Sequence, residues 1–559
     1  MTKKLKFLAI VTIIFVALLF PTVLHAQSRQ LPPGYLRVGL GSSAELIESR
    51  SPALDVFISA GSEFLNMGTI TGADTFRLHA DNYYYVFSGF VFDGVSAALT
   101  QAAPPNRIAA LSGGMWAVYA GPFTSEAEAL SLTGASFGDL RAPTGNRIAL
   151  YSGWQRIAVF DNDLHISFFA DSRGDMVTIN GYDYRGYLAA HRIGSNVVPV
   201  NVVHLEDYLL SVVPSEMPAS WPLHALKAQA VAARSYTHTT MGAHEERGYD
   251  LCAAVCCQVY LGIRQEYERS TEAVRATRGM VALHNGEVIN AVYSSSSGGI
   301  TDNSENVWQE ALPYLRSVAD PYDVTGREWS RTFTRTQLTH IAAANDAGIG
   351  TVQSVRIEPS QTGRVQRLIL VGDSGQIALE REAIRTFFAP SPGGSLYSRV
   401  FRIDSFNVSG GGGSGITTTP PPQGTGANVF VTNGSTPQIQ NMSGLRFLDR
   451  DGTLASITSG NIHVQTADGL RVLSPMGIGV GAGATTGTST PVNIAQNVQI
   501  SGELSSSNYS ITFIGRGWGH GVGMSQHGAR GMAYAGHTFE QILMHYFRGI
   551  TLGVREDFE

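Results

Sequence analysis

The sequence contains few cysteines and few charged residues, and these shortages exclude several classes of protein. Only three cysteines occur in 559 residues, all between positions 252 and 257, so the chain is not a small disulfide-stapled scaffold. Lysine and arginine number 39 against 45 acidic residues, and the net charge is −6. This balance lacks the basic excess of nucleic-acid-binding proteins and of polybasic membrane patches, so we expect no nucleic-acid partner.

Long hydrophobic runs are also missing, except for one at the start of the chain. Residues 1–6 carry positive charge and precede the apolar segment 7–20, which is short for a membrane span. Pro21 follows, and then a small residue, Ala26. This pattern predicts a secretory signal peptide over residues 1–26, with a retained membrane anchor as the alternative. We therefore expect an extracytoplasmic protein that is secreted, associated with the cell wall, or anchored by this segment.

Glycine, in contrast, is abundant at 62 residues, and 43% of the chain is hydrophobic. The length suggests about three to four domains with packed cores. Segments of alternating apolar and polar residues, such as 35–40, 157–169 and 176–193, predict strands. A Gly/Ser run at 410–415, followed by Thr and Pro at 417–422, predicts a linker that is flexible first and then extended.

The segment around Glu216 combines a lone carboxylate with two prolines. Because Pro214 and Pro218 disfavour a continued helix, we expect Glu216 to lie on a rigid connector. Ser220 is then expected to cap an alanine-rich helix that carries Arg234. Two interpretations follow from these residues: a surface glutamate beside a solvated basic helix face, or a catalytic carboxylic acid with an arginine on a rigid helix.

A second unusual segment, residues 515–523, has glycine at every second position. In a strand, this spacing would put all five glycines on one face and Arg516, Trp518, His520 and Val522 on the other. A face without side chains would let another backbone or a flat sugar ring approach closely. A phosphate-binding loop is not indicated, because no Gly-Lys-Ser/Thr follows.

Residues 81–151 form a separate pattern. Strand-like and helix-like segments follow one another in the order βαββαβ, with the last strand expected at 147–151. The segment from Trp116 to Ala129 resembles the sporulation-related repeat (SPOR) domain, which implies binding to peptidoglycan glycan strands without stem peptides. The alternative is a small α+β insert with no ligand.

Several motifs, which occur in the expected order, resemble the stage II sporulation protein D family, which includes the amidase enhancers. The motifs are Val213-Pro-Ser-Glu-Met-Pro218, the segment from Ala225 to Tyr236, Cys257-Gln-Val-Tyr260, Ser297-Gly-Gly299, the segment from Pro313 to Val318, and residues 515–528. The likeness covers roughly residues 36–80, 150–407 and 508–559. The SPOR-like unit and residues 408–507 lie between these parts as insertions.

The resemblance implies an α+β fold, with a β-rich core and several helices around a glycan cleft. A small ferredoxin-like α/β insert and a variable β insert complete it. The expected segments are a signal peptide (1–26), the start of the sporulation protein D-like domain (28–80), a SPOR-like glycan-binding domain (81–151), the main part of the catalytic domain (152–407), a Gly/Pro linker (408–427), the β insert (428–507) and the C-terminal part of the catalytic domain (508–559).

The resemblance also implies a function in the cell wall. Family members with the sporulation role are lytic transglycosylases acting on peptide-free glycan strands, whereas the enhancers stimulate a partner amidase. We therefore expect an extracytoplasmic peptidoglycan lytic transglycosylase. The alternative is a non-catalytic adaptor that binds glycan and activates an N-acetylmuramoyl-L-alanine amidase. The expected partners are glycan strands and a cell-wall amidase, with the membrane involved only if the signal segment is retained.

The family's catalytic glutamate falls on Glu216. Most glycosidases use two carboxylates, but a lytic transglycosylase replaces the attacking water with the C6 hydroxyl of the muramic acid itself. One side chain then acts as acid and afterwards as base, forms a 1,6-anhydro end, and needs no cofactor. Such an acid requires a dry pocket that raises its pKa, and we expect Pro214, Met217, Pro218 and Trp221 to supply it.

Three further residues are expected to bind the substrate. The resemblance places a functional arginine on Arg234 and the family's Tyr-Leu-Lys segment on Tyr314 and Arg316, where arginine replaces lysine. We expect both arginines to bind lactyl carboxylates away from Glu216, because an arginine touching that acid would lower its pKa. Tyr314 is expected to position the scissile sugar.

The cysteine cluster leaves alternatives open. Relatives carry two cysteines here, which match Cys252 and Cys257, while Cys256 occupies a position that is often histidine, and zinc has been associated with the segment. Three sulfurs with His244 are suited to a tetrahedral structural zinc site. In an exported protein, a Cys252–Cys257 or Cys252–Cys256 disulfide is the competing prediction, and free thiols are the third.

Overall fold

The computed structural model describes part of the chain. The described residues are 31–60, 63–72, 74–102, 107–112, 114–133, 139–161, 168–171, 176–324, 327–360, 362–408 and 509–555, with short strands between 428 and 473. The predicted signal peptide at 1–26 and the predicted linker at 408–427 lie almost entirely outside these residues.

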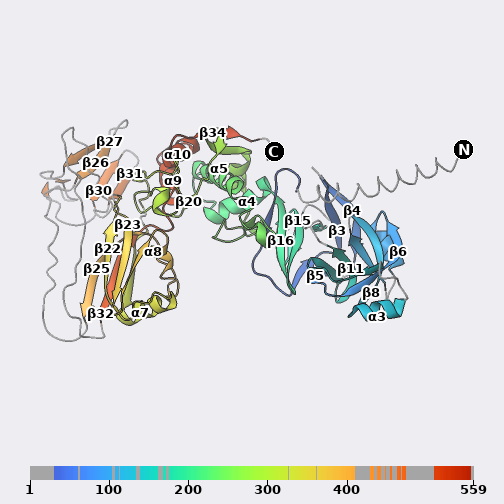
Figure 1. The fold of residues 1–559 in the computed structure, drawn as a ribbon. Coiled ribbons are helices and arrows are strands. Elements are labelled where there is room, and N and C mark those ends of the chain that lie inside the picture. Colours follow the sequence, from blue (N-terminus) through green and yellow to red (C-terminus); the bar gives the residue numbers. More distant parts are fainter. Residues whose placement is uncertain are drawn as a thin grey trace. The chain divides into compact units, whose positions relative to one another are not determined.

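Internal contacts divide the chain into two compact units (Figure 1). Unit 1 comprises residues 1–291 and 550–559, and unit 2 comprises residues 292–549. The boundary falls inside the segment 152–407, which the sequence assigned to one domain. Both units mix helices with a larger number of strands, and this confirms the predicted α+β class.

Unit 1 contains a seven-stranded sheet with the order β17-β1-β16-β15-β12-β3-β4. The strands are β1 (Tyr35–Gly39), β3 (Ala53–Ala60), β4 (Glu63–Thr71), β12 (Phe168–Asp171), β15 (Tyr187–Ile193), β16 (Asn196–His204) and β17 (Leu251–Cys252). The valine-rich strand β16 is buried along almost its whole length, as expected for a strand covered on both faces. It pairs antiparallel with β1 and β15 and leads directly into the helix that carries Glu216.

An eight-stranded sheet has the order β2-β5-β10-β11-β7-β8-β6-β9. Its elements are β2 (Leu46–Arg50), β5 (Thr75–Ala80), β6 (Tyr84–Phe92), α2 (Val95–Gln101), β7 (Arg107–Ser112), β8 (Met115–Phe123), α3 (Glu126–Thr133), β9 (Leu140–Arg141), β10 (Arg147–Ser152) and β11 (Gln155–Asp161). The strands β9-β6-β8-β7 with α2 and α3 follow a βαββαβ order with antiparallel neighbours.

One boundary in this sheet was predicted wrongly. The strand that closes the βαββαβ order is β9, because it pairs with β6. The expected closing strand, β10, pairs instead with β5 and β11 and so joins the neighbouring part of the sheet. The sequence predicted β10 as a strand but not the two-residue strand β9, and only long-range pairing shows which strand lies at which edge. Assignment of this segment as a SPOR domain stays a prediction.

The remainder of unit 1 is mostly helical. It comprises the hairpin β13 (Met176–Ile179) and β14 (Tyr182–Arg185), the helices α4 (Leu205–Glu216), α5 (Leu223–Thr240) and α6 (Glu268–Arg275), the short 3₁₀ helices η2 (Glu245–Arg247) and η3 (Ile263–Gln265), and the sheet of β18 (Met280–His284), β19 (Glu287–Val288) and β34 (Thr551–Val554). The alanines of α5 are fully buried, so this alanine-rich helix packs closely against its neighbours.

Two local expectations about the connector were wrong. Pro214 does not end the helix: α4 continues through it to Glu216, and the Met217 amide still donates to the Val213 carbonyl. Only one turn follows Pro214, so a single missing amide is tolerated. Ser220 does not cap α5 either, because Pro222 occupies the N-cap position without a side-chain hydrogen bond.

Unit 2 is built from small sheets and short helices. Its elements are β20 (Tyr293–Ser294), η4 (Ser304–Asn306), β21 (Trp329–Thr334), α7 (Arg335–Ala344), β22 (Val352–Pro359), β23 (Val365–Gly372), β24 (Gln376–Glu380), α8 (Ala383–Thr386), β25 (Val400–Val408), β32 (Tyr509–Arg516), β33 (Met524–Ser525), α9 (Gln526–Tyr534) and α10 (Phe539–Tyr546). The order β21-β32-β25 brings a strand from residues 509–516 between strands that precede the insert. Helix α10 begins with a capping box formed by Thr538 and Gln541.

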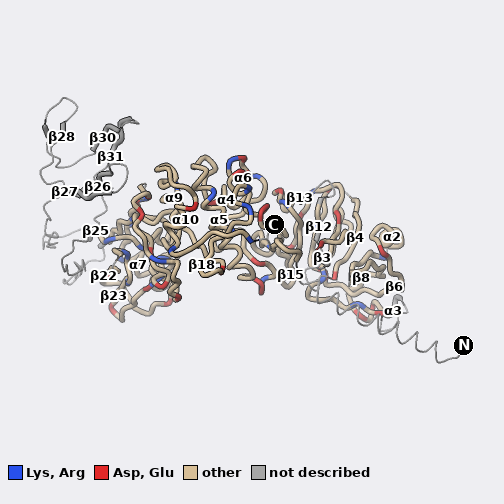
Figure 2. The backbone as a smooth tube through the Cα atoms, turned by 90° about the horizontal axis from the view of Figure 1, so that it is seen from above, with Lys and Arg blue, Asp and Glu red and all other residues tan. Residues whose placement is uncertain are grey.

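The predicted insert at 428–507 contributes three short hairpins. They are β26 (Asn428–Thr432) with β27 (Pro437–Asn441), β28 (Phe447–Leu448) with β29 (Leu454–Ala455), and β30 (Ile462–Thr466) with β31 (Gly469–Leu473). Figure 2 shows basic and acidic positions interspersed along the described backbone. Among the described residues, no helix has both the length and the hydrophobicity needed to cross a bilayer.

Candidate functional site

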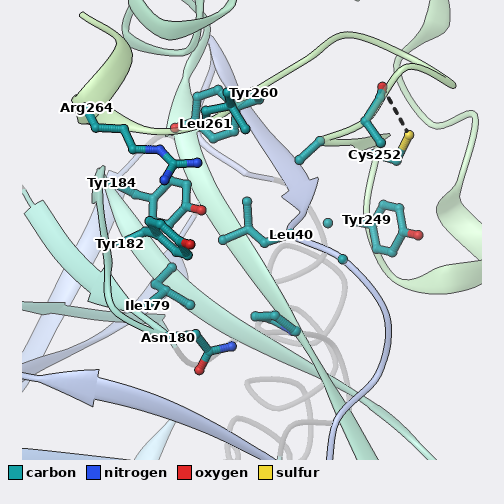
Figure 3. A pocket seen from close by; sticks show the side chains of 15 residues that line it. Leu40, Ile179, Asn180, Tyr182, Tyr184, Tyr249, Cys252, Tyr260, Leu261 and Arg264 are labelled. Carbon is teal, nitrogen blue, oxygen red and sulfur yellow. Dashed lines mark hydrogen bonds between the residues drawn. The ribbon is translucent and has the colours of Figure 1, made fainter.

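A pocket of about 410 Å³ lies in unit 1 beside the cysteine-containing segment (Figure 3). Residues 252–254 and 260–261 of that segment contribute to its lining, but Glu216 does not. The predicted catalytic carboxylate therefore lies outside this pocket. The segment 252–261 connects them.

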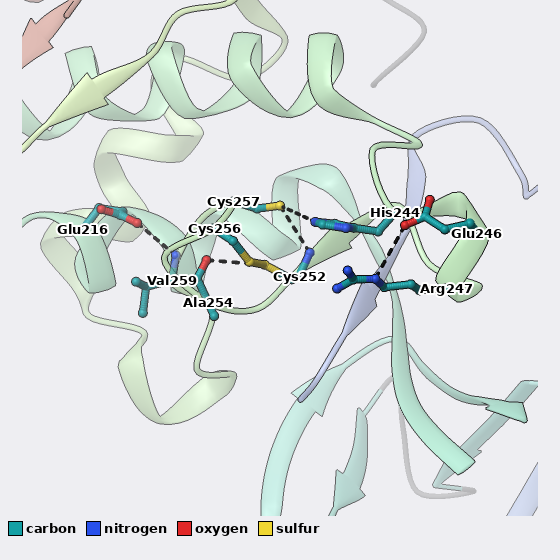
Figure 4. The surroundings of a disulfide bond; sticks show 9 residues. All are labelled: Glu216, His244, Glu246, Arg247, Cys252, Ala254, Cys256, Cys257 and Val259. Atoms are coloured by element: carbon teal, nitrogen blue, oxygen red, sulfur yellow. Dashed lines mark hydrogen bonds and ion pairs between the residues drawn. A yellow bond between two sulfur atoms is a disulfide. The ribbon is translucent and has the colours of Figure 1, made fainter. Parts of the chain in front are cut away.

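Glu216 is the last residue of α4, and the first turn of this helix is stabilised in two ways. The His204 side chain accepts a hydrogen bond from the Glu206 amide, and Glu206 and Asp207 place negative charge in the first turn, where the helix dipole favours it. Glu216 is half-buried, and its Oε1 accepts a hydrogen bond of 2.9 Å from the Val259 amide (Figure 4). The helix end thus presents an anchored carboxyl group.

The chain around this carboxyl group is largely apolar. Of the residues expected to form a dry wall, Pro214, Met217 and Trp221 are buried, and Met217 has no exposed surface. Pro218 is exposed, so the prediction that it belongs to a buried apolar wall was wrong.

The segment that binds Glu216 is held by the two long helices. The Gln258 side chain is fully buried and accepts hydrogen bonds from Tyr208 of α4 at 3.2 Å and from Thr237 of α5 at 2.7 Å. Its amide nitrogen also donates to a carbonyl of α5. Next in the chain, the Leu261 amide donates to the Ser211 hydroxyl. These contacts on both sides of Val259 fix the amide that Glu216 accepts from.

Tyr236 is a functional candidate that sequence reasoning missed. Burial, followed by the nearby charges of Cys257 and Glu216, raises the pKa of Tyr236 to about 12. Its phenol is therefore protonated near neutral pH and is suited to donating a hydrogen bond, not to accepting a proton. The signal that could have identified it is its place in the motif Ala-Ala-Arg-Ser-Tyr, two residues after Arg234.

Arg234 does not occupy the position expected of a substrate-binding residue. Its side chain is fully buried in unit 1 and makes a bidentate pair with Glu206, at 2.7 and 2.8 Å, while Nη1 donates to the Met280 carbonyl at 3.0 Å. These bonds tie α5 to the first turn of α4 and to β18. Arg234 therefore holds the scaffold of Glu216, and its predicted role in substrate binding stays a prediction.

The cysteine cluster contains a disulfide between Cys252 and Cys256, one of the two pairings predicted (Figure 4). Cys257 is a free thiol, and its Sγ lies 3.3 Å from His244 Nε2. Burial raises the pKa of this thiol. The four donor atoms lie within 4.8 Å of one another. A histidine nitrogen and three sulfurs fit a tetrahedral zinc site only after the disulfide is reduced, because zinc binds thiolates.

The other two predicted substrate residues belong to unit 2. Arg316 forms a bidentate pair with Glu305, at 2.8 and 2.6 Å, and also donates to the Leu312 carbonyl. This pair lowers the pKa of Glu305. The guanidinium of Arg316 thus supports its own loop. Tyr314 is half-buried, and its carbonyl accepts from the Arg548 amide. Because Tyr314 and Glu216 are in different units, their juxtaposition stays a prediction.

The glycine-alternating segment of unit 2 is a loop and not the strand that was predicted. Strand β32 ends at Arg516, and Gly517, Gly519, Gly521 and Gly523 all have positive φ angles between 70° and 105°. Their missing side chains make room for specific neighbours: a Cβ at position 521 would lie 2.3 Å from the Arg364 guanidinium. Alternate glycines therefore serve backbone conformation and close packing.

Two buried polar clusters surround this loop. Burial, then the charge of Arg385, lowers the pKa of His520 to about 3, so its imidazole is neutral while Nε2 contacts the Tyr293 carbonyl at 2.9 Å. Burial is also the main reason that the pKa of Asp320 is raised to about 6, with the Asp323 charge adding to the shift. Ser297 donates to Asp320 at 2.7 Å. These groups hold the segment 294–299 (Ser-Ser-Ser-Ser-Gly-Gly), which contains the motif Ser297-Gly-Gly299.

Residues 194–284, which include β16, α4, α5, the cysteine segment and β18, match the family model of stage II sporulation protein (SpoIID). The carboxylate at the end of α4 and the segment that binds it both lie inside this match. The chain thus carries a SpoIID domain, which confirms the predicted family.

The relatives agree with this assignment. The chain is 29% identical over 404 residues to the amidase enhancer of Bacillus subtilis (strain 168). The aligned region covers 71% of this chain and 48% of that protein. Over 152 residues it is 34% identical to stage II sporulation protein D of the same organism, covering 24% of this chain and 44% of that protein. An uncharacterized protein of Brachyspira hyodysenteriae is 39% identical over 146 residues, covering 26% and 39%. The chain spans about half of these relatives or less.

Proposed function

We propose that this protein acts on bacterial peptidoglycan outside the cytoplasm, as a lytic transglycosylase that cleaves glycan strands poor in stem peptides. The observation that carries the proposal is the setting of Glu216. Its carboxyl group is half-buried at the end of α4 and one oxygen is anchored by the Val259 amide. Arg234, the arginine predicted to act with it, is paired with Glu206 instead.

The proposal assigns both the acid step and the base step to this one carboxyl group. In the proposed reaction, Glu216 gives its proton to the glycosidic oxygen as the bond from that oxygen to C1 of the muramic acid breaks. The C6 hydroxyl of the same sugar then attacks C1, and its proton returns to the Glu216 carboxylate. No water is consumed, and the product ends in a 1,6-anhydro sugar.

The test uses glycan strands from which an amidase has removed the stem peptides. We expect the wild-type protein to release anhydro-ended sugars, detected by mass spectrometry, and Glu216→Gln to lose this activity by about 100-fold or more. Glu272→Gln is the matched control, because Glu272 is an exposed glutamate of the same unit on α6. Products from Glu216→Gln at the wild-type rate, or none from the wild type, would rule out the enzyme.

A second function is favoured by one observation, the similarity over 71% of this chain to a protein named amidase enhancer. In that case, the protein binds glycan and stimulates a cell-wall amidase without cleaving the strand. Adding the protein to a purified amidase on intact peptidoglycan would then raise the rate of stem-peptide release. Glu216→Gln should stimulate as well as the wild type, whereas loss of stimulation in that variant would contradict the adaptor role.

Two further parts of the proposal concern binding. The segment 81–151 is proposed to hold the same glycan as a SPOR-like unit. After reduction, His244, Cys252, Cys256 and Cys257 are proposed to hold zinc, since their donor atoms already lie together. Bound there, the metal would supply a rigid cross-link of the segment that carries Val259, and no catalytic step is assigned to it.

A further inference from the structure

The pocket of unit 1 has a lining that the proposed catalytic role does not use. Four tyrosines contribute to it: Tyr182, Tyr184, Tyr249 and Tyr260. Figure 3 shows Tyr182, Tyr184 and Arg264 on one side of the pocket and Tyr249 with Cys252 on the other. Its volume of about 410 Å³ is within the range of small-molecule sites. Aromatic rings at such density are suited to the apolar C–H faces of sugar rings.

The charge in this pocket has one sign. Arg264 is the single charged residue among those lining it, and no acidic residue is among them. The guanidinium is exposed and lies over the Tyr182 ring at 4.3 Å, and the structure pairs it with no carboxylate among the described residues. A stacked arginine keeps its outer N–H groups available for a bidentate carboxylate. The pocket therefore favours a ligand that combines a sugar ring with a carboxylate.

The pocket is built with some rigidity. Tyr260 is buried, and its hydroxyl donates to Asn201 at 2.7 Å. Gly262 has a positive φ of 75°, and a Cβ there would lie 2.4 Å from the Asp183 carbonyl. This glycine lets the segment that carries Arg264 pack closely against β14. The backbone conformation at Gly262 therefore places Arg264 beside the tyrosines.

We propose that this pocket is a non-catalytic subsite for a carboxylated amino sugar of the muramic acid type, within a glycan strand. The proposal rests on the proposed function for its choice of ligand. The segment 252–261 supplies part of the pocket and also the Val259 amide that holds Glu216. A strand bound in the pocket is therefore held against the same segment that positions the catalytic carboxyl group.

The test measures binding by calorimetry in a Glu216→Gln background, so that nothing is cleaved. The probe is the disaccharide of N-acetylglucosamine and N-acetylmuramic acid with a free lactyl carboxylate, and chitobiose is the comparison without a carboxylate. We expect Arg264→Gln to weaken binding of the acidic disaccharide about tenfold and Arg264→Lys to weaken it less. Chitobiose should bind more weakly to the parent protein and be insensitive to both changes.

Matched controls separate the pocket from the rest of the surface. Arg275→Gln replaces an exposed arginine of α6, and Tyr267→Ala replaces an exposed tyrosine to match Tyr182→Ala. We expect both controls to bind like the parent and Tyr182→Ala to lose affinity. Thermal melting confirms that each variant is folded.

Two outcomes would overturn the subsite: no binding of the acidic disaccharide at millimolar concentration, or equal binding by Arg264→Gln and Arg275→Gln. These results are independent of the cleavage assay. Anhydro products that depend on Glu216, together with failure of the binding test, would remove only the pocket. Binding that depends on Arg264 without any cleavage would remove only the transglycosylase.

Discussion

Replacing Arg234 by methionine tests whether this residue holds the scaffold or binds substrate. The change removes a guanidinium with no exposed surface and leaves Glu206, whose side chain is 7% exposed, without its bidentate partner. Two hydrogen bonds of 2.7 and 2.8 Å are lost, and the Met280 carbonyl loses a donor at 3.0 Å. Removing one member of a buried ion pair costs roughly 3–5 kcal/mol of unfolding free energy, and we expect Arg234→Met to fall in this range.

The assay is urea unfolding followed by circular dichroism. Arg275→Met, a change at an exposed arginine of α6, is expected to stay within about 0.5 kcal/mol of wild type. In the double variant Glu206→Gln, Arg234→Met, no unpaired charge remains, so much of the lost stability should return. The reasoning would be refuted if Arg234→Met unfolds like wild type yet binds peptide-free glycan much more weakly. That result would restore the predicted substrate role.

Three more outcomes follow from the structure. First, the pKa of Asp320 is about 6 in the folded chain against an ordinary value of 3.8, so the folded state binds more protons between these pH values and the unfolding free energy should fall as pH rises from 3.8 to 6. Asp320→Asn should remove this part of the pH dependence, which urea titrations at several pH values measure; an unchanged pH dependence in the variant would contradict the prediction. Second, Gly521→Ala should destabilise the protein by about 2 kcal/mol or more, because φ is +76° and the added Cβ would meet Arg364. The control Gly536→Ala, with φ of +89° and nothing within 4 Å of the added Cβ, should cost only about 1 kcal/mol of backbone strain, so equal melting temperatures of the two variants would argue against the packing explanation. Third, reduced protein should bind about one zinc per chain by elemental analysis, and Cys257→Ser should bind much less, while equal zinc in both would exclude the site.

The contrast between Glu216 and Arg234 shows where sequence reasoning stopped. The motif correctly placed Glu216 next to α5 and its buried alanines, because helical spacing and local composition are readable along the chain. The partner of Arg234 is Glu206, 28 residues earlier, and no local pattern announces that pair. The burial that makes Arg234 a structural residue appears only when α4, α5 and β18 pack together.

The glycine loop shows the same limit in another form. Alternating glycines agree equally well with a flat strand face and with alternating left-handed residues. The close neighbours of Gly517, Gly519 and Gly521, which come from residues 294–298 and 364, decide for the loop. In the 81–151 segment, likewise, the strands were readable but the edge strand β9 was not, because pairing joins residues far apart in the sequence.

By itself, the sequence determined the α+β class, the SpoIID family, the alanine-rich helix and the cluster of one histidine and three cysteines, since all of these rest on composition, spacing and short motifs. The tertiary structure decided which charged groups are buried with partners, which backbone amide holds Glu216, and that tyrosines from separate strands and loops meet Arg264 around one pocket. Burial and pairing depend on contacts between distant segments, and such contacts exist only in the folded chain.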